Sequence, residues 1–316
     1  MSTPASGSRI PVRLGLGTSG MGEVAEHQDQ ETAAVKFALD LGYRLIDTAE
    51  DYGKGQAERL VGDALRAFGP QRRAEIFIMS KVYPENASRA GTVKACEASI
   101  ERLGCEYIDL YLLHWRGPHP FTETLQAFDE LSKRKLVRGF GVSNFDVDDL
   151  VEWRQAEKRL GIFPGASANE ISYRLNRRGI EYGQLDWHRS HGLQTIGYGP
   201  LGQGDLPQHP AVRQVAVKRG ITPGQVALAW CLRIPDIITI PKSVKTDRIR
   251  ENFEALKVTL TPDDLQQLHQ AFPLKHRWLK ANPLLRLARS TARKIVRRMK
   301  PPASRTAKPG APSDHG

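Results

Sequence analysis

The chain has 316 residues, of which 40% are hydrophobic and 26% are charged, and its formal net charge at pH 7 is +11. This composition is typical of a globular protein with a large core, and no run approaches the roughly 18 consecutive apolar residues of a membrane-spanning helix. The N-terminal segment lacks the apolar core of a signal peptide, and three cysteines in no zinc-binding pattern exclude a disulfide framework. We therefore expect a cytoplasmic protein with reduced cysteines and no metal site.

The positive charge is concentrated at the C-terminal end of the sequence. Residues 277–316 contain eleven Lys and Arg against one acid, Asp314, and carry +10, which leaves +1 for residues 1–276. A near-neutral body gives no reason to expect nucleic-acid binding by that part of the chain. Residues 276–316 are predicted to form a basic, partly disordered tail. Two interpretations of it stay open: a solubilising extension, or an amphipathic segment that contacts anionic surfaces such as lipid or nucleic acid.

Eight β-rich runs alternate with stretches of helical periodicity along the chain. The predicted strands cover 12–18, 43–49, 75–82, 107–115, 136–144, 166–172, 193–200 and 237–243. The predicted helices lie near 31–41, 55–68, 89–103, 122–134, 146–160, 179–190, 209–219 with 223–233, and 246–256, and another follows at 262–271. Eight strand–helix units predict one (β/α)8 TIM barrel over residues 9–275, because a doubly wound sheet more often stops at five or six strands.

Ionisable residues follow three successive predicted strands. Asp47 ends the second strand with Tyr52 five residues beyond it, Lys81 ends the third, and His114 ends the fourth. Because the loops at the carboxyl ends of barrel strands converge, we expect the four side chains to share one rim. Helix capping, solvation or packing could explain each residue alone. Together they predict an acid–base site.

The expected chemistry of this rim follows from ordinary proton affinities. A tyrosine with a pKa of about 10 is a poor acid unless a cation lies beside it, and Lys81, paired with Asp47, would supply that charge. His114 would orient a carbonyl group or share the proton. A proton donor at a carbonyl oxygen needs a hydride donor for the carbon, and a nicotinamide is the obvious candidate. A Schiff base on Lys81 is the competing chemistry.

The segment at 240–252 favours the nicotinamide. Lys242, Ser243, Lys245 and Arg248 stand where the eighth strand passes into a helix. Cations and a hydroxyl at a helix N-terminus suit phosphate groups. Three cations within seven residues exceed the need of a diphosphate and indicate the additional 2′-phosphate of NADPH. The alternative is an exposed basic helix start.

Several motifs, in this order, resemble the aldo-keto reductase family. They are GLGT at 15–18, LIDTAEDYGKGQAERLVGDAL at 45–65, SKV at 80–82, DLYLLHW at 109–115, GVSNF at 141–145, GYGPLGQG at 197–204 and IPKSVKTDRIREN at 240–252. The resemblance covers about residues 9–272. It implies a TIM barrel that reduces aldehydes and ketones with NADPH/NADP+ and a catalytic tetrad of Asp47, Tyr52, Lys81 and His114, in which Tyr52 donates the proton.

The same resemblance implies the remaining site residues. Ser143 and Asn144 would bind the carboxamide of the cofactor, and Tyr198 would stack on its nicotinamide ring. The full expected cofactor set is Gly17, Thr18, Ser143, Asn144, Glu170, Tyr198, Leu201, Gln203, Lys242, Ser243, Arg248 and Asn252. The expected walls of the substrate pocket are Met21, Tyr83 and Trp115.

The sequence departs from the family pattern at three places. Glu170 stands where an amide usually binds the carboxamide, and a carboxylate can accept a hydrogen bond from that group but cannot donate one unless it is protonated. Gly199 replaces a commoner serine, and Ser19-Gly20 replace a bulky residue. These changes affect the cofactor site and the shape of the substrate pocket.

We therefore expect a monomeric, NADPH-dependent oxidoreductase that reduces small aldehydes, 2-oxoaldehydes or ketones to alcohols. Only a short segment separates Trp115 from the next predicted helix, so the substrate pocket should be open. Two alternatives remain at this point. One is a catalytically weak nicotinamide-binding barrel with a regulatory or redox-sensing role, and the other is a Schiff-base lyase that uses Lys81.

Overall fold

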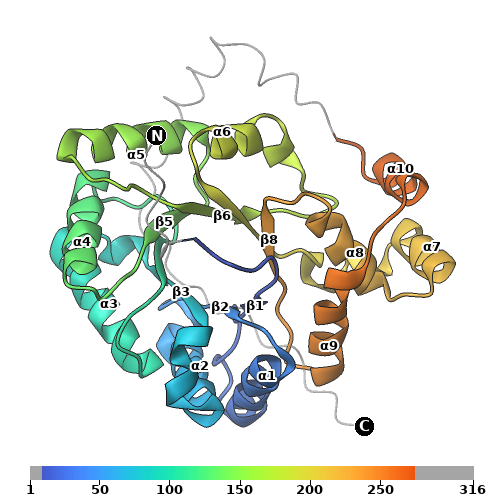
Figure 1. Cartoon of the computed structure of the whole chain (residues 1–316), viewed down its shortest axis with the longest axis horizontal. Coiled ribbons are helices and arrows are strands. Elements are labelled where there is room, and N and C mark those ends of the chain that lie inside the picture. Colours follow the sequence, from blue (N-terminus) through green and yellow to red (C-terminus); the bar gives the residue numbers. More distant parts are fainter. Residues whose placement is uncertain (1–8, 275–316) are drawn as a thin grey trace, which may run out of the picture. The chain divides into compact units, whose positions relative to one another are not determined.

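Eight parallel strands form a barrel in the computed structural model, which describes residues 9–274 (Figure 1). Each strand pairs with the next in chain order, and hydrogen bonds from Gly15 N to Thr239 O (2.9 Å) and from Gly17 N to Pro241 O (3.1 Å) close the ring. The strands are β1 (Leu16–Gly17), β2 (Leu45–Asp47), β3 (Phe77–Val82), β4 (Leu110–Leu113), β5 (Phe140–Ser143), β6 (Ala168–Ser172), β7 (Gln194–Tyr198) and β8 (Ile237–Ile240). The predicted TIM barrel is thus confirmed.

Helices surround the strands on the outside of the barrel (Figure 1). Thr222 and Thr261 cap two of them in capping boxes with proline in the first turn, as predicted. The helices are α1 (Gln28–Leu41), α2 (Gln56–Phe68), α3 (Arg89–Leu103), α4 (Phe121–Lys133), α5 (Val147–Leu160), α6 (Gln184–Ser190), α7 (Pro210–Arg219), α8 (Pro223–Leu232), α9 (Thr246–Glu254) and α10 (Pro262–Ala271).

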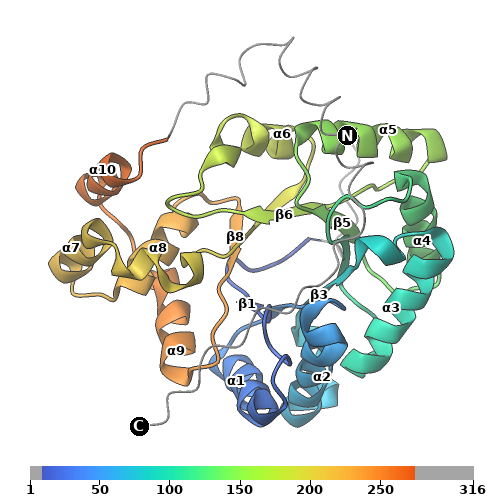
Figure 2. The same ribbon diagram turned by 180° about the vertical axis from the view of Figure 1, so that it is seen from behind.

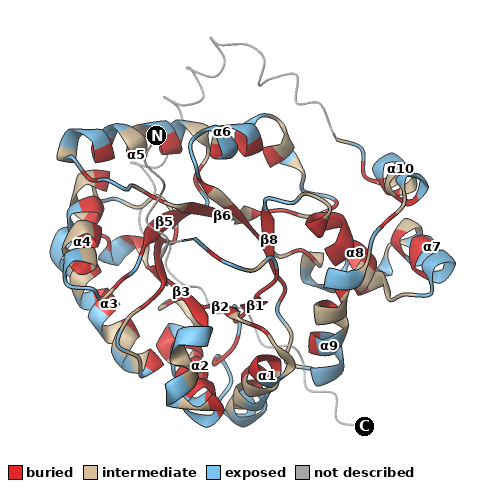
Figure 3. Ribbon diagram, viewed as in Figure 1, coloured by how far each residue is buried: buried red, intermediate tan, exposed pale blue. Residues whose placement is uncertain are grey.

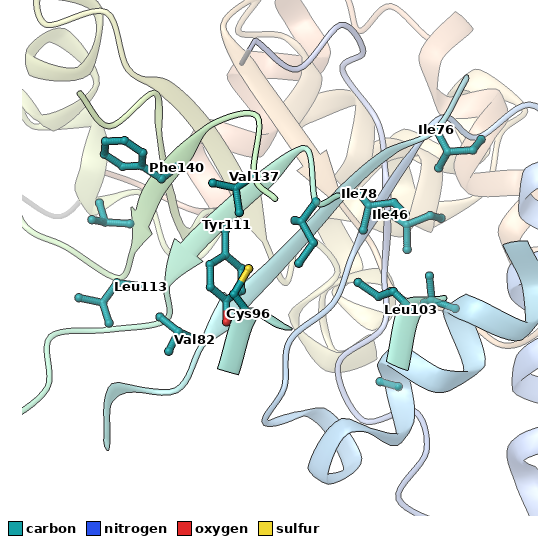
Figure 4. Packing of buried hydrophobic residues seen from close by; sticks show 14 of the residues in the cluster. Ile46, Ile76, Ile78, Val82, Cys96, Leu103, Tyr111, Leu113, Val137 and Phe140 are labelled. Carbon is teal, nitrogen blue, oxygen red and sulfur yellow. The ribbon is translucent and has the colours of Figure 1, made fainter. Parts of the chain in front are cut away.

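Side chains on the strands alternate between the barrel interior and the layer beneath the helices. On β3, Phe77 and Met79 belong to the interior cluster, whereas Ile78 and Val82 belong to the outer one. Figure 4 shows this outer layer, in which Tyr111 of β4 lies close to Cys96 of α3. The strands are therefore buried on both sides, and the helices expose only their outer faces (Figure 3).

The crossover from β7 to β8 carries two helices instead of one. Residues 226–232 of α8 are all buried, while α7 and α10 pack against each other farther from the barrel (Figures 1 and 2). A second hydrophobic cluster, which includes Val212, Trp230 and Leu268, joins these three helices. The apolar run of α8 is explained by this position between the barrel and the outer helices.

Among residues 9–274, no helix is long and apolar enough to cross a membrane. The same residues contain no group of three or more His, Cys, Asp or Glu side chains that could hold a metal ion. The predicted basic tail at 276–316 and the expected domain boundary at 275 lie outside the described residues, so both remain predictions.

Candidate active site

Polar side chains form the layer directly above the hydrophobic interior of the barrel. Five residues of the interior cluster are each followed, two positions later, by a polar residue. Because residues two positions apart on a strand face the same side, these polar side chains also point into the barrel. The pairs are Leu45 with Asp47, Met79 with Lys81, Leu112 with His114, Ala168 with Glu170, and Ile196 with Tyr198. The strand period thus brings five elements to one site at the carboxyl end of the barrel.

Lys81 lies at the centre of this layer with no exposed surface. Its ammonium group donates hydrogen bonds to a carboxylate oxygen of Asp47, to Thr48 O (3.1 Å) and to Tyr52 Oη (3.2 Å). Burial acts to lower the pKa of Lys81, but the carboxylates of Asp47 and Glu170 outweigh it and raise the pKa well above its usual value. Lys81 is therefore a cation with all three protons engaged.

Tyr52 begins the short turn Tyr52–Gly55 after β2, and it lines the cleft above the barrel. Its hydroxyl oxygen accepts the hydrogen bond from Lys81, which leaves its own proton free to be donated. Burial raises the pKa of Tyr52 above 10, while Lys81 acts in the opposite direction. Lys81 thus lowers the pKa of Tyr52 as expected, but burial raises it by more.

His114 stands across from Tyr52, with the two rings edge to face at a centroid separation of 5.6 Å. Burial, together with the nearby Lys81, lowers the pKa of His114 to about 3. The imidazole is therefore neutral at pH 7, and its buried Nδ1 has no hydrogen-bond partner within residues 9–274. A neutral imidazole can donate a hydrogen bond to a substrate carbonyl, but it lacks the second ring proton that an imidazolium would transfer as an acid.

Asn144 links three strands at the edge of the site. Its backbone has a positive φ of 62°, which asparagine tolerates better than most residues. The side-chain amide donates to His114 O (3.1 Å) and to Ser143 Oγ (3.1 Å), and its carbonyl oxygen accepts from the hydroxyl of Tyr198 (2.8 Å). These bonds orient the Tyr198 ring along the wall of the cleft.

The cleft has a volume of about 1280 Å³, larger than the roughly 300–1,000 Å³ typical of sites for drug-sized ligands. One end is formed by the start of α9, where Lys242, Lys245 and Arg248 line the wall. No side chain caps the N-terminus of α9, so its first N–H groups are available to an anion. In the described chain Arg248 pairs with Glu251 at 2.9 Å.

Most of the residues predicted for the cofactor lie on this cleft. Thr18 and Ser143 are fully buried behind the wall, and Thr18 Oγ1 donates to Asp47 O (2.9 Å). Gln203 has a positive φ of 59° in the loop after β7. The predicted residues on the wall are Gly17, Asn144, Glu170, Tyr198, Leu201, Gln203, Lys242, Ser243, Arg248 and Asn252.

Two of the three residues expected as pocket walls, Met21 and Tyr83, are not among the residues that line the cleft. Met21 is fully buried in the hydrophobic core, because a turn closed by a hydrogen bond from Met21 N to Thr18 O (2.9 Å) directs it inward. Tyr83 packs edge to face against Trp115 at a centroid separation of 5.2 Å and supports it from behind. Trp115 itself lines the cleft.

The sequence reasoning missed two arginines on the wall. Arg174 and Arg177 follow β6 and line the cleft beside the loop after β7. Arg174 donates to Ser172 Oγ (2.8 Å). Its guanidinium also lies close to Gly199, because a Cβ atom built on Gly199 would be 3.4 Å from Arg174 Nη1. Burial and the neighbouring Arg177 lower the pKa of Arg174. The available signal was their position directly after a strand whose end faces the site.

Comparison with known proteins identifies the class of protein. Residues 13–272 of this eight-stranded barrel match the Aldo/keto reductase family, a class of oxidoreductases. The chain belongs to that family. It is 38% identical over 268 residues to the methylglyoxal reductase YeaE of Escherichia coli K12, covering 82% of this chain and 90% of the relative.

Two further proteins are similar to this chain over most of their length. A glyoxal reductase of Bacillus subtilis is 36% identical over 244 residues, covering 77% of this chain and 84% of the relative. An aldo/keto reductase from Klebsiella pneumoniae, solved in complex with NADP and acetate, matches with a TM-score of 0.78 and 39% identity, covering 84% of this chain and 93% of that one.

Proposed function

We propose that this protein reduces small carbonyl compounds to alcohols with NADPH, and that Tyr52 donates the proton to the carbonyl oxygen. The observation that carries the proposal is the Tyr52 hydroxyl, which accepts a hydrogen bond from Lys81 in a residue that lines the cleft, so that its own proton remains to be donated. NADPH, when bound, supplies the hydride for the carbonyl carbon.

The remaining members of the cluster prepare Tyr52 for this role. Lys81 stabilises the negative charge that develops on the tyrosine oxygen as its proton leaves, and Asp47 fixes the ammonium in place. His114, which is neutral at pH 7 and stands beside Tyr52, holds the carbonyl oxygen by a hydrogen bond. Because its pKa is about 3, His114 is a far weaker candidate for the proton donor than Tyr52.

The donor groups of the cleft fit the proposed cofactor. Asn144 and Glu170 line the part of the cleft where the carboxamide would bind. The uncapped start of α9 with Lys242 and Arg248 would hold the 2′-phosphate. Arg174 and Arg177, which line the cleft after β6, would face the diphosphate near Gly199, which offers no hydroxyl.

Two relatives are named as reductases of the small 2-oxoaldehydes methylglyoxal and glyoxal, and we expect the same class of substrate for this protein. The cleft beside Trp115 is open, which suits a small substrate held mainly through its carbonyl group. Schiff-base chemistry is disfavoured, because Lys81 is cationic, fully buried and already donates three hydrogen bonds.

Tyr52→Phe tests the proposal. The variant should bind NADPH as the wild type does but lose roughly 10²–10⁴-fold in kcat for methylglyoxal, because it lacks only the transferable proton. NADPH absorbance measures turnover, and protein fluorescence measures binding. Tyr107→Phe is the matched control, since Tyr107 packs against Arg73 and Arg138 away from the cleft. Near wild-type turnover in Tyr52→Phe would refute the assignment of the proton donor.

A further inference from the structure

Two buried carboxyl groups face the single ammonium of Lys81. Asp47 of β2 and Glu170 of β6 are each 2% exposed. The three protons of the ammonium are donated to Asp47, Thr48 and Tyr52. Glu170 Oε2 lies 3.2 Å from Lys81 Nζ and forms an ion pair with it. Glu170 therefore stands beside the same ammonium group that Asp47, Thr48 and Tyr52 bind.

Counting charge indicates which form of Glu170 the site favours. With both carboxyl groups ionised, the buried cluster would carry one uncompensated negative charge, which is costly at low dielectric. A proton on Glu170 makes the cluster neutral and allows the hydrogen bond between the Glu170 and Asp47 carboxyl groups. In agreement, burial and the neighbouring Asp47 raise the pKa of Glu170 to about 8.

Every element packed around Glu170 contributes to its environment. Its charged or titratable neighbours are Asp47 from β2, Lys81 from β3, Tyr52 from the loop after β2, and Tyr198 from β7. On the remaining side, β5 places the neutral Ser143 in register with Glu170. Lys81 is the one cation in this set, and Tyr52 shares it directly.

We propose that Glu170 is a positioning residue that acts on Tyr52 through Lys81, and that loss of its proton switches off carbonyl reduction. In the protonated form, Glu170 leaves the charge of Lys81 to Asp47 and Tyr52. In the ionised form, it competes for that charge and adds a negative charge beside the tyrosine, which raises the pKa of Tyr52 further and opposes proton donation. The inference rests on the proposed function.

The test is the pH dependence of kcat/KM for methylglyoxal in wild type and Glu170→Gln, which keeps the shape of the side chain but cannot ionise. The wild type should lose activity about tenfold per pH unit above pH 8, as expected when one required proton is lost. In Glu170→Gln the decline should begin at least one pH unit higher, where Tyr52 itself ionises. At pH 9 the ratio of variant to wild-type activity should therefore be roughly tenfold above its value at pH 7.

A matched control and a spectroscopic readout separate this role from a structural one. Glu50→Gln removes another carboxyl group with a raised pKa. The Glu50 carboxylate accepts from Tyr83 N and is not among the groups that bind the Lys81 ammonium, so the pH profile of this variant should follow the wild type. Infrared difference spectra should contain the carbonyl band of a protonated carboxylic acid that disappears near pH 8 and is absent in Glu170→Gln. A profile in Glu170→Gln identical to the wild type, or no lost carboxylic-acid band, overturns the inference.

These outcomes also distinguish the two proposals. If Tyr52→Phe is inactive but Glu170→Gln keeps the wild-type pH profile, the reductase proposal stands and only the role of Glu170 is wrong. If the wild type reduces no carbonyl compound in the presence of NADPH, the proposed function fails, and the inference about Glu170 fails with it.

Discussion

Single residues at the site follow from the period of a β-strand. Once Leu45, Met79 and Leu112 are known to face the interior, Asp47, Lys81 and His114 must face the same way, so their meeting was predictable from sequence. The place of Met21 was not, because it depends on how one turn directs a side chain. The cleft position of Arg174 depends on the irregular segment after β6, for which the sequence offers no periodicity.

The cations of the cleft divide into two groups with separable effects. Arg248 lies at the start of α9 beside the expected 2′-phosphate, which NADH lacks, whereas Arg174 lies near the expected diphosphate, which both cofactors share. Arg248→Ala should raise the KM for NADPH about tenfold with little change for NADH. Arg174→Gln should raise both KM values by a similar factor. Steady-state kinetics with each cofactor measures these effects.

The two variants control for each other, since each removes one guanidinium from the same cleft. Equal effects of Arg248→Ala on NADPH and NADH would mean that Arg248 contacts a group common to both cofactors, or none. A loss confined to NADPH in Arg174→Gln would place the 2′-phosphate on the wall after β6 instead of at the start of α9.

At the scale of elements, strands and helices were predicted in the right order because the two hydrophobic periods differ clearly in this chain. The predicted strands are longer than the observed ones at most ends, since apolar character continues into residues that no longer pair with a neighbouring strand. The helix predicted at 179–190 is divided: a 3-10 turn covers Gly179–Glu181, and α6 begins after Gly183, whose φ is +89°. A left-handed glycine at a helix start is not visible in hydrophobic periodicity.

The packing of α2 against α3 leaves no room for a side chain at Gly62. A Cβ on Gly62 would stand 2.6 Å from Arg102 O at the end of α3, far inside contact distance. Gly62→Ala should therefore destabilise the protein by roughly 1–3 kcal/mol, although alanine in an open helix interior gains up to about 1 kcal/mol. Gly224→Ala in α8 is the control, since its Cβ would meet Thr222 Oγ1 at an ordinary 3.8 Å. Urea unfolding followed by circular dichroism measures both, and a raised midpoint for Gly62→Ala would contradict the packing argument.

At the scale of the whole molecule, charge and catalytic machinery occupy different parts of the chain. The proposed site draws on β1 through β8 and on the start of α9, all within the described residues. The sequence beyond residue 276 carries +10 of the net charge of +11. The barrel provides its own cleft cations, so we expect the function of the tail to be separable from reduction of carbonyls.

Truncation after residue 275 tests this separation. The shortened protein should keep kcat and KM for methylglyoxal within about twofold, because the strands, the cleft and α10 precede the cut. It should lose binding to DNA and to anionic vesicles, since clustered Lys and Arg bind such surfaces by releasing counterions. For the full-length protein, that binding should fall by roughly 10³-fold between 50 and 200 mM salt if six or more phosphate contacts form.

The competing interpretation is that Trp278 and the leucines at 284, 285 and 287 contribute to the substrate site. Turnover of one small and one bulky aldehyde by both proteins decides between them: a large loss of activity, or a reversed preference for size after truncation, would show that the tail belongs to the catalytic site.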